Sequence, residues 1–477
     1  MRFWTIISLI LVLSAVGLTY EIAAGRVLAP FFGTSLLTWT TVIATVLAGF
    51  SLGSALGGLI AERERPEAIR MARKALVATA ALMALSPLIL GAVYGLGARG
   101  TVGMIVAVVV AFFPASVLVT LPSPLLAKLA VDARPGREGS SLGLVLAAGS
   151  VGAIAGAILA GFVTLPLIGS AATFTACGAV ALMCLQVLRS KDAGPHSPGA
   201  TLAAVFLVGA SLLIGPICRY ESGLSCIDVV QRGATIYLTS DRTTQAAEAT
   251  GSAREDALVL SYTRWLWERM DQDLGPDPSV LFIGGGGYTL PTQLLETRPA
   301  SHAVTVEIDP LVTEVVRRHL PGAGAAIEDS GYTPGQAEDG DRFGIVHADG
   351  RVFINETDRR FDAVVMDAFS SGSVPAHLAT RETYARLREI VEGPVYVNLL
   401  DRPDGRLARG LHAILSELYP HVRAVQSPVW DTGHANFLMI ADAAPIEPLD
   451  RLPAGYSVTQ ISEGRAFTDD RGWHGHR

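Results

Sequence analysis

Charge is what this 477-residue sequence has least of. Only 17% of its residues are charged, against roughly a quarter in an ordinary soluble chain. The deficit lies in the first half, where residues 139–188 contain no Asp, Glu, Lys or Arg. From Arg219 onward, charged residues occur throughout. This shift predicts a domain boundary near residue 218.

The sequence also lacks a basic excess and a cysteine cluster. Its formal net charge of −7 offers no basic footprint for a phosphate backbone, so no nucleic-acid partner is predicted. Of its four cysteines, Cys177 and Cys184 lie in an apolar run and are expected to pack there. Cys218 and Cys226 would remain thiols in a reducing compartment, and could pair outside the cytosol. Their spacing does not fit a zinc site, and no metal is predicted.

Long apolar runs fill the first half instead, and the mean hydropathy is +0.40. A helix needs about 20 mostly apolar residues to cross a bilayer. A multi-pass bundle of about seven helices over residues 1–218 is therefore predicted, with spans at 3–23, 37–60, 75–97, 101–121, 142–164, 170–188 and 199–217. The first span lacks a convincing cleavage site and is expected to be retained. Two small-residue stripes, Gly49-x-x-x-Gly53-x-x-x-Gly57 and Gly152-x-x-x-Gly156, are expected to pack helices closely.

Basic residues alternate between the two sides of the predicted bundle. They gather after the second, fourth and sixth spans: Arg63, Arg65, Arg70, Arg73, Lys74, Lys128, Arg134, Arg137, Arg189 and Lys191. The opposite loops hold only Arg26 and Arg99. This pattern predicts a protein of the cell inner membrane with its N-terminus in the cytoplasm and, after seven spans, its soluble part on the outer, periplasmic face. Glu21 and Arg26 either line a polar site or anchor the first helix at the interface.

The second half alternates short β-branched runs with amphipathic stretches, as in a parallel sheet covered by helices. Residues 219–278 are expected to form a small β/α region with a hairpin at 225–240, and residues 279–477 a Rossmann-like α/β domain. Its strands are predicted at 279–283, 303–307, 343–347, 361–366, 393–398, 421–426 and 434–440.

A run of four glycines, 284–287, follows the first of these strands. Glycines allow the backbone to approach a ligand, and a carboxylate at the end of the next strand can accept both ribose hydroxyls. Glu307 stands about 20 residues beyond the glycines, where such an acid belongs. Asp349 follows the third strand and is expected near an adenine edge. Gly284, Gly286, Glu307 and Asp349 are therefore the predicted cofactor-binding residues.

Several motifs carry a family resemblance. Those at 280–286, 306–310, 348–350 and 366–370 resemble the motifs of the spermidine synthases, or polyamine aminopropyltransferases. Those at 367–370, 374–378 and 467–470 resemble the relatives of that family that carry an N-terminal membrane bundle. The resemblance covers residues 219–477. It implies a methyltransferase-like Rossmann fold and transfer of an aminopropyl group from decarboxylated S-adenosylmethionine to a primary amine.

The resemblance also implies roles for individual residues. By motif, Asp367 stands where a carboxylate orients and deprotonates the amine, although an acidic helix cap is its other reading. His377, on the same loop, is the second catalytic candidate. The family's aspartate for the amine of the donor is Gly287 here, and its aspartate for the acceptor is Ser370. The predicted substrate-binding residues are Tyr262, Arg264, Tyr288 and Ser370.

Four functions remain open. The first is a membrane-anchored, spermidine synthase-like transferase that acts on an amine, and the second is an S-adenosylmethionine-dependent methyltransferase. The third is an extracytoplasmic, nucleotide-free enzyme that acts on an amine or a peptide N-terminus, for example by cyclisation. The fourth is a polyamine transporter or sensor. The expected cofactor is accordingly decarboxylated S-adenosylmethionine, S-adenosylmethionine or none, and the expected partners are the lipid bilayer and a small amine or peptide amine. The residues name neither the acceptor nor an oligomeric state.

Overall fold

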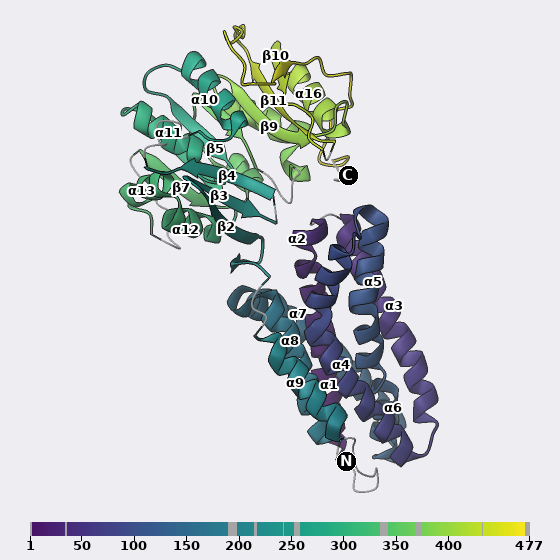
Figure 1. Ribbon diagram of the computed structural model, residues 1–477. Coiled ribbons are helices and arrows are strands. Elements are labelled where there is room, and N and C mark those ends of the chain that lie inside the picture. The colour runs from purple at the N-terminus through teal and green to yellow at the C-terminus, as the bar shows by residue number, and fades with distance from the viewer. Residues whose placement is uncertain are drawn as a thin grey trace. The chain divides into compact units, whose positions relative to one another are not determined.

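The computed structural model describes residues 2–33, 36–188, 198–213, 217–241, 243–251, 258–333, 342–368, 374–431 and 433–472. The chain divides into two compact units, Met1–Cys226 and Ile227–Arg477. The first is helical and the second contains the sheets (Figure 1). The boundary predicted at residue 218 lies a few residues before this division.

Apolar helices build the first unit. They are α1 (Phe3–Val27), α2 (Ala29–Phe32), α3 (Leu36–Ala61), α4 (Arg65–Gly95), α5 (Gly100–Thr120), α6 (Ser123–Asp132), α7 (Glu138–Leu159), the π-helical η1 (Ala160–Thr164), α8 (Leu165–Val187) and α9 (Pro198–Ser211). In the described part of the chain, five helical segments are long and apolar enough to cross a membrane: Phe3–Phe32, Leu36–Ala61, Arg65–Gly95, Gly100–Asp132 and Glu138–Val187. Large apolar side chains such as Phe162 and Leu167 remain exposed on them, as on a surface that faces lipid.

The last of the five segments contains the fifth and sixth predicted spans. The helix is π-helical over η1 and loses helical geometry at Gly169, where φ is 76° and ψ is 175°. Gly169 lies between the predicted spans 142–164 and 170–188. The seventh predicted span corresponds to α9, which has 14 described residues, so the number seven stays a prediction. Part of the first basic cluster lies in α4 rather than in a loop, because this helix already begins at Arg65.

The two glycine stripes pack helices against each other, as predicted. A Cβ atom at Gly53 of α3 would overlap the carbonyl oxygen of Val117 in α5. On α7, a Cβ atom at Gly156 would overlap the carbonyl oxygen of Ala15 in α1. The hydroxyl of Thr19 donates a 3.0 Å hydrogen bond to the carbonyl of Gly156. Only glycine permits such close backbone contact.

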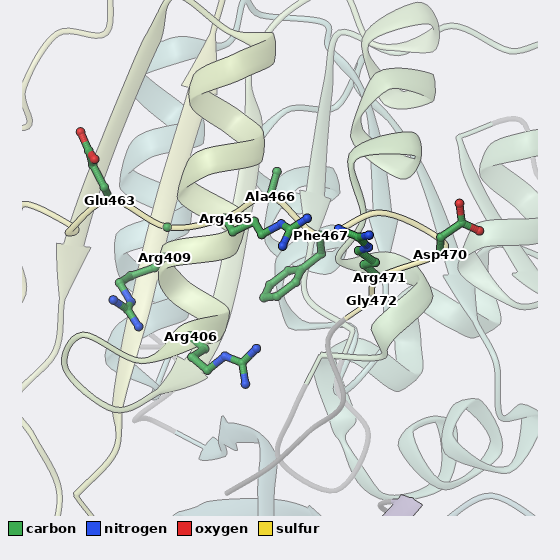
Figure 2. A pocket seen from close by; sticks show the side chains of 10 residues that line it. Arg406, Arg409, Glu463, Arg465, Ala466, Phe467, Asp470, Arg471 and Gly472 are labelled. Atoms are coloured by element: carbon green, nitrogen blue, oxygen red, sulfur yellow. The ribbon is translucent and has the colours of Figure 1, made fainter.

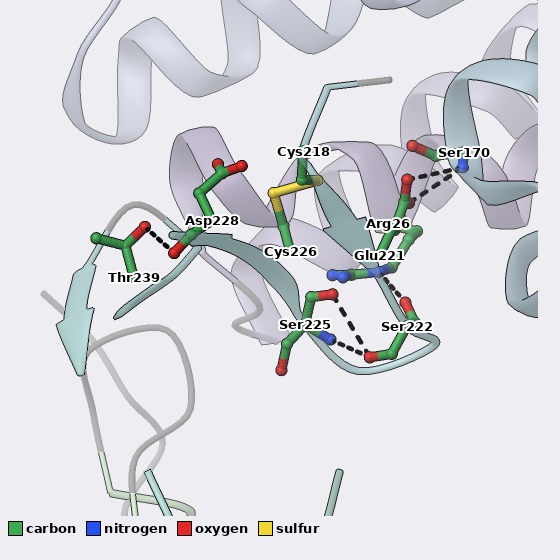
Figure 3. The surroundings of a disulfide bond; sticks show 9 residues. All are labelled: Arg26, Ser170, Cys218, Glu221, Ser222, Ser225, Cys226, Asp228 and Thr239. Carbon is green, nitrogen blue, oxygen red and sulfur yellow. Dashed lines mark hydrogen bonds between the residues drawn. A yellow bond between two sulfur atoms is a disulfide. The ribbon is translucent and has the colours of Figure 1, made fainter. Parts of the chain in front are cut away.

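A disulfide joins Cys218 to Cys226 at the end of the first unit, with Cα atoms 5.5 Å apart (Figure 3). The sequence left this pairing open. Between the two cysteines, the Ser222 hydroxyl accepts a 2.8 Å hydrogen bond from the Ser225 amide, and the Ser222 amide donates to the Ser225 carbonyl at 3.0 Å. A short turn therefore closes the loop inside the disulfide.

Polar contacts tie this loop to the helices. The Glu221 carboxylate, on β1 (Tyr220–Glu221), accepts two 3.1 Å hydrogen bonds from the Ser170 amide of α8. The buried Arg26 of α1 donates from Nε to the Ser222 carbonyl at 3.2 Å. Figure 3 shows both contacts beside the disulfide. Arg26 thus makes a specific contact at the end of its helix, beyond interface anchoring.

The second unit begins with strands of a small sheet whose order is β1-β2-β3-β4. They are β2 (Cys226–Arg232), β3 (Thr235–Ser240) and β4 (Thr243–Ala249), and β3 is antiparallel to both of its neighbours. The first two strands form a hairpin within the range 225–240, and β4 adds a strand that the sequence did not indicate. Helix α10 (Ser261–Asp273) follows, within the region 219–278 that was predicted to be β/α.

The core domain is one large sheet with helices between its strands. Its strands are β5 (Ser279–Ile283), β6 (His302–Glu307), β7 (Phe343–His347), β8 (Ala363–Met366), β9 (Val395–Asp401), β10 (His421–Gln426), β11 (Ala435–Asp442) and β12 (Ser457–Val458). Its helices are α11 (Thr289–Thr297), α12 (Pro310–His319), α13 (Pro321–Asp329), α14 (Gly350–Glu356), η4 (Ala376–Leu378), α15 (Arg381–Ile390) and α16 (Arg406–Leu418). All seven predicted strands are present, with ends that differ by a few residues.

The strand order is β12-β10-β11-β9-β8-β5-β6-β7. Strands β5 to β9 run parallel, and β11 lies antiparallel between β9 and β10. This is a methyltransferase-like variant of the Rossmann fold. From β5 the chain builds outward through β6 and β7, then returns to the other side of β5 with β8. The crevice at such a switch in direction is where open α/β sheets bind ligands.

The disulfide can be tested by counting thiols. We expect alkylation of the denatured protein, prepared without reductant, to label two of the four cysteines, and to label all four after reduction. Intact-protein mass spectrometry gives the number of labels. As a control, Cys226→Ser should give three labels with or without reductant. Four labels on the unreduced wild type would contradict the pairing.

Candidate active site at the switch between β5 and β8

The glycine run lies against the end of β8. Gly284 has a φ of 105°, which favours glycine. A Cβ atom there would lie 2.5 Å from the Asp367 carbonyl oxygen. The Asp367 amide in turn donates a 2.9 Å hydrogen bond to the carbonyl of Ile283. The loop after β5 and the loop after β8 are therefore held side by side at the switch point.

Glu307 shapes the same glycine loop from β6. Its Oε2 accepts hydrogen bonds from the amides of Gly285 and Gly286, at 2.8 and 3.3 Å, and its Oε1 accepts one from the Asp309 amide at 2.9 Å. Burial raises the pKa of Glu307, while these hydrogen bonds act in the opposite direction. The acid predicted to bind ribose is thus at the expected strand end, with both oxygens already accepting hydrogen bonds from the chain.

Tyr288 occupies the space beside Gly285, where a larger residue would carry its side chain. Its side chain is fully buried, and its hydroxyl shares a 2.6 Å hydrogen bond with the Thr313 hydroxyl of α12. A Cβ atom at Gly285 would come within 2.8 Å of the Tyr288 ring. Burial, together with the negative charge of Glu307, raises the pKa of Tyr288 well above its usual value. In this position Tyr288 packs the core behind the loop.

Asp349 and His377, predicted for different roles, form a pair. One Asp349 oxygen caps α14 by accepting hydrogen bonds from the amides of Arg351 and Val352, at 2.8 and 3.3 Å. The other lies 2.9 Å from Nε2 of His377, whose side chain is 49% exposed. The described contacts therefore pair His377 with Asp349, the predicted cofactor-binding residue.

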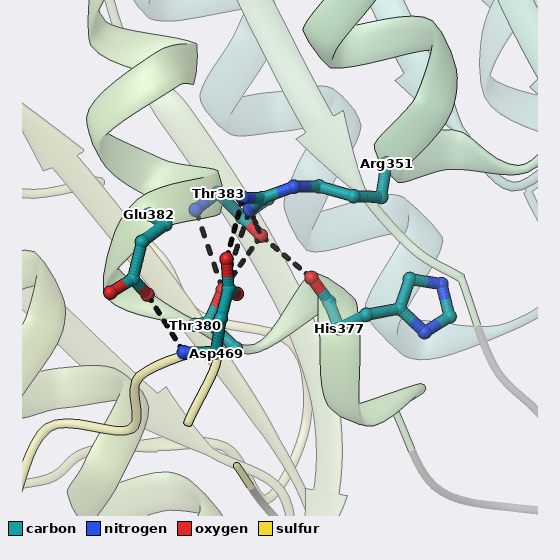
Figure 4. A network of polar contacts seen from close by, with 6 residues as sticks. All are labelled: Arg351, His377, Thr380, Glu382, Thr383 and Asp469. Carbon is teal, nitrogen blue, oxygen red and sulfur yellow. Dashed lines mark hydrogen bonds and ion pairs between the residues drawn. The ribbon is translucent and has the colours of Figure 1, made fainter. Parts of the chain in front are cut away.

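The C-terminal motif anchors the segment that carries His377. Asp469 accepts hydrogen bonds from the Thr380 hydroxyl at 2.8 Å and from Arg351 at 3.1 Å, and its amide donates to Glu382 at 3.0 Å. Thr383 donates to the His377 carbonyl at 2.7 Å. Figure 4 shows the His377 imidazole pointing away from this network. The residues of the motif at 467–470 thus hold the tail to α14 and α15.

Asp367 is the acid at the centre of the site, just beyond the end of β8. Nδ2 of Asn398 donates to its Oδ1 at 2.8 Å, and the Tyr262 hydroxyl also hydrogen-bonds to the carboxylate. The same hydroxyl lies 3.4 Å from the Gln245 carbonyl of β4. Burial raises the pKa of Asp367 to about 7, although the two hydrogen bonds act to lower it. A carboxylate with this pKa can exchange protons at neutral pH.

A buried amide chain supports Asp367 from behind. Nδ2 of Asn436 donates to Oδ1 of Asn398 at 2.8 Å, and the Asn436 amide donates to the Ser427 hydroxyl at 2.9 Å. Both asparagines are almost fully buried. Bonding from Asn436 fixes the amide flip of Asn398, so that its NH₂ group faces Asp367. Sequence reasoning missed Asn398, whose one signal is a polar residue inside the apolar run 395–400.

The remaining predicted residues lie elsewhere or are not described. Arg264 is exposed on α10, and its Nη2 donates to the Leu258 carbonyl at 3.2 Å. Ser370 lies outside the described residues. Among the described predicted residues, the structure therefore brings Tyr262 and the glycine loop to Asp367, and adds Asn398 to them.

Comparison with known proteins agrees with this architecture. Residues 273–398 match the family model of the spermine/spermidine synthase domain. The polyamine aminopropyltransferase of Vibrio vulnificus is 32% identical over 121 residues, 24% of this chain and 35% of that protein. The one of Saccharolobus solfataricus is 33% identical over 118 residues, 24% of this chain and 36% of that protein. This chain spans about a third of the length of these relatives.

Solved structures resemble the chain at lower identity. A probable spermidine synthase from Corynebacterium glutamicum is 18% identical, with a TM-score of 0.44, over 54% of this chain and 97% of that one. The spermidine synthase of Thermotoga maritima is 18% identical, with a TM-score of 0.36, over 53% and 80%. The match to the family model shows that the second unit carries a spermidine synthase-like domain, as the motifs predicted.

The role of Asn398 can be tested by substitution. A carboxyl pKa raised from about 3.9 when unfolded to about 7 makes the folded state hold more protons across that window, so stability falls as pH rises through it. Asn398→Ala removes a donor that stabilises the charged carboxylate of Asp367. We therefore expect it to raise the pKa of Asp367 further and to extend the loss of stability to higher pH. Infrared titration of the protonated carboxyl band measures the midpoint, and Asp367→Asn identifies the band. An unchanged midpoint would refute the role.

Proposed function

We propose that the protein is a membrane-anchored, spermidine synthase-like transferase that acts on a primary amine. The observation that carries the proposal is the position of the Asp367 carboxylate at the switch point of the sheet, where Asn398 donates to it at 2.8 Å and burial raises its pKa to about 7. The match of residues 273–398 to the synthase domain supports the transfer chemistry. The five apolar helical segments of the first unit support the membrane anchor.

Asp367 orients the amine and takes its proton. Asn398 and Tyr262 donate to the carboxylate, and a carboxylate has about four lone-pair sites, so an amine hydrogen can be held on one of those that remain. A free amine is a far stronger base than a carboxylate with a pKa near 7, but its nitrogen becomes acidic as it bonds to carbon. The proton then passes to Asp367 as the nitrogen lone pair forms the bond to that carbon and the bond between the carbon and its leaving group breaks. A base whose pKa lies near the working pH suits this step.

The described residues fit a nucleoside donor poorly. Both oxygens of Glu307 accept hydrogen bonds from backbone amides, and both oxygens of Asp349 are engaged by α14 and His377. Tyr288 fills the space beside Gly285. The assignment of decarboxylated S-adenosylmethionine or S-adenosylmethionine as donor therefore rests on the family resemblance.

Substitution of Asp367 tests the proposal. We expect Asp367→Asn to lower the rate of amine transfer by about 10²- to 10⁴-fold, the usual contribution of a general base. Primary amines are offered with decarboxylated S-adenosylmethionine, with S-adenosylmethionine and with no donor, and products are followed by mass spectrometry. Asp358→Asn, at an exposed carboxylate, is the matched control and should keep the wild-type rate. A wild-type rate in Asp367→Asn would exclude the role of general base.

The second candidate is an extracytoplasmic, nucleotide-free enzyme on an amine or a peptide N-terminus. The Cys218–Cys226 disulfide favours it, because such bonds persist mainly outside the cytosol. The alternation of basic residues along the first unit also favours an outer location. A product that forms without either donor in the experiment above, and still requires Asp367, would select this candidate.

Topology is tested independently of activity. We expect an alkaline phosphatase fused after Arg477 to be active in cells, because this enzyme matures only outside the cytosol. The matched control is the same reporter fused after Gly136, in the turn between α6 and α7, which the charge pattern assigns to the cytoplasm and which should be inactive. Activity from the Gly136 fusion alone would place the domain in the cytosol, among nucleoside donors.

A further inference from the structure

One cleft of the second unit gathers four arginines. Two lie on α16 and two on the tail formed by residues 463–472, and the cleft has a volume of about 620 Å³, within the range of small-molecule sites. Figure 2 shows the arginines and Phe467 between two acidic residues at the ends of the row. The lining side chains that matter here are Arg406, Arg409, Arg465, Arg471, Phe467, Glu463 and Asp470.

The walls of this arginine cleft are fixed parts of the fold. Phe467 is 8% exposed, and a Cβ atom at Gly410 of α16 would overlap its ring. The Phe467 carbonyl accepts a 2.8 Å hydrogen bond from the Arg381 amide of α15. At the other end, a Cβ atom at Gly464 would overlap the Arg409 carbonyl. The tail is therefore packed against α16 on both sides of Arg465.

The guanidinium groups of the cleft lack anionic partners among the described residues. Nearby, Arg351 pairs with Asp469 at 3.1 Å and Arg381 with Glu417 at 2.8 Å. In the described part of the chain, no ion pair involves the four cleft arginines. Nε of Arg409 is moreover buried without a hydrogen-bond partner. The charge of these guanidinium groups is therefore available to an anion that enters the cleft.

We propose that the arginine cleft binds a phosphate-bearing ligand. The planar guanidinium fork matches phosphate oxygens in pairs, and Arg406 and Arg409, three residues apart on α16, share one face of the helix. The volume leaves room for a further group beside one phosphate. None of the lining residues belongs to the amine site, so this ligand is separate from the transferase substrate. Its phosphate belongs either to a soluble ester or to a phospholipid headgroup.

The test titrates inorganic pyrophosphate into the full chain in neutral detergent by calorimetry. We expect saturable binding that weakens with ionic strength, and at least tenfold weaker binding by the double variant Arg406→Gln/Arg409→Gln. The charge-preserving variant Arg406→Lys/Arg409→Lys should fall between, since it loses only the fork geometry. Arg360→Gln, at an exposed arginine outside the cleft, is the matched control. Asp367→Asn should bind as the wild type does, which separates this proposal from the proposed function.

Two results would overturn the site. One is no saturable binding by the wild type at low ionic strength, and the other is an equal loss of affinity in Arg360→Gln and the double variant. Unchanged thermal unfolding of the variants shows that they fold. Displacement of pyrophosphate identifies the source of the phosphate: preferential displacement by short-chain phosphatidic acid indicates a lipid, and equal displacement by glycerol phosphate indicates a soluble ester.

Discussion

The backbone contact between Gly284 and Asp367 is the constraint on which the second unit depends. Loops diverge where the sheet changes direction between β5 and β8, and a side chain at residue 284 would push them apart. With glycine there, the two loops touch, and the Asp367 amide binds the end of β5. Glu307 secures the next two amides from β6. The catalytic candidate is therefore positioned by backbone contacts, which few substitutions can imitate.

The pKa of Asp367 depends on a balance between burial and hydrogen bonding. Burial alone favours the protonated carboxyl group, while donors to its oxygens favour the charged form. Asn398 and Tyr262 supply these donors to Asp367, and the result is a pKa of about 7. Asn436 keeps Asn398 oriented, so the tuning extends to a residue that does not contact the carboxylate. Glu307 differs because three backbone amides donate to its two oxygens.

Local patterns predicted the strands, because each is a short apolar run rich in β-branched residues. They also predicted the glycine loop and the acid at the end of β6, because both directly follow or end such a run. The partners of each acid were not predictable in the same way. Whether Glu307 meets a ribose or its own loop depends on distances that no sequence period encodes. From the sequence, Asn398 is predicted only as a core position of β9. Its contact with Asp367 depends on the pairing of β9 with β8. The Cys218–Cys226 bond likewise depends on a Cα separation that spacing alone does not fix.

Two independent features bear on whether a nucleoside donor binds: the surroundings of the glycine loop and the disulfide. Tyr288 fills the space beside Gly285, and Glu307 and Asp349 already accept hydrogen bonds from other residues of the chain. The disulfide is independent of that loop and favours an oxidising compartment. Asp367 and its asparagine support remain unaffected by either. Asp367 with its asparagine support is therefore the part of the site that the proposed amine chemistry requires, whatever group the amine receives.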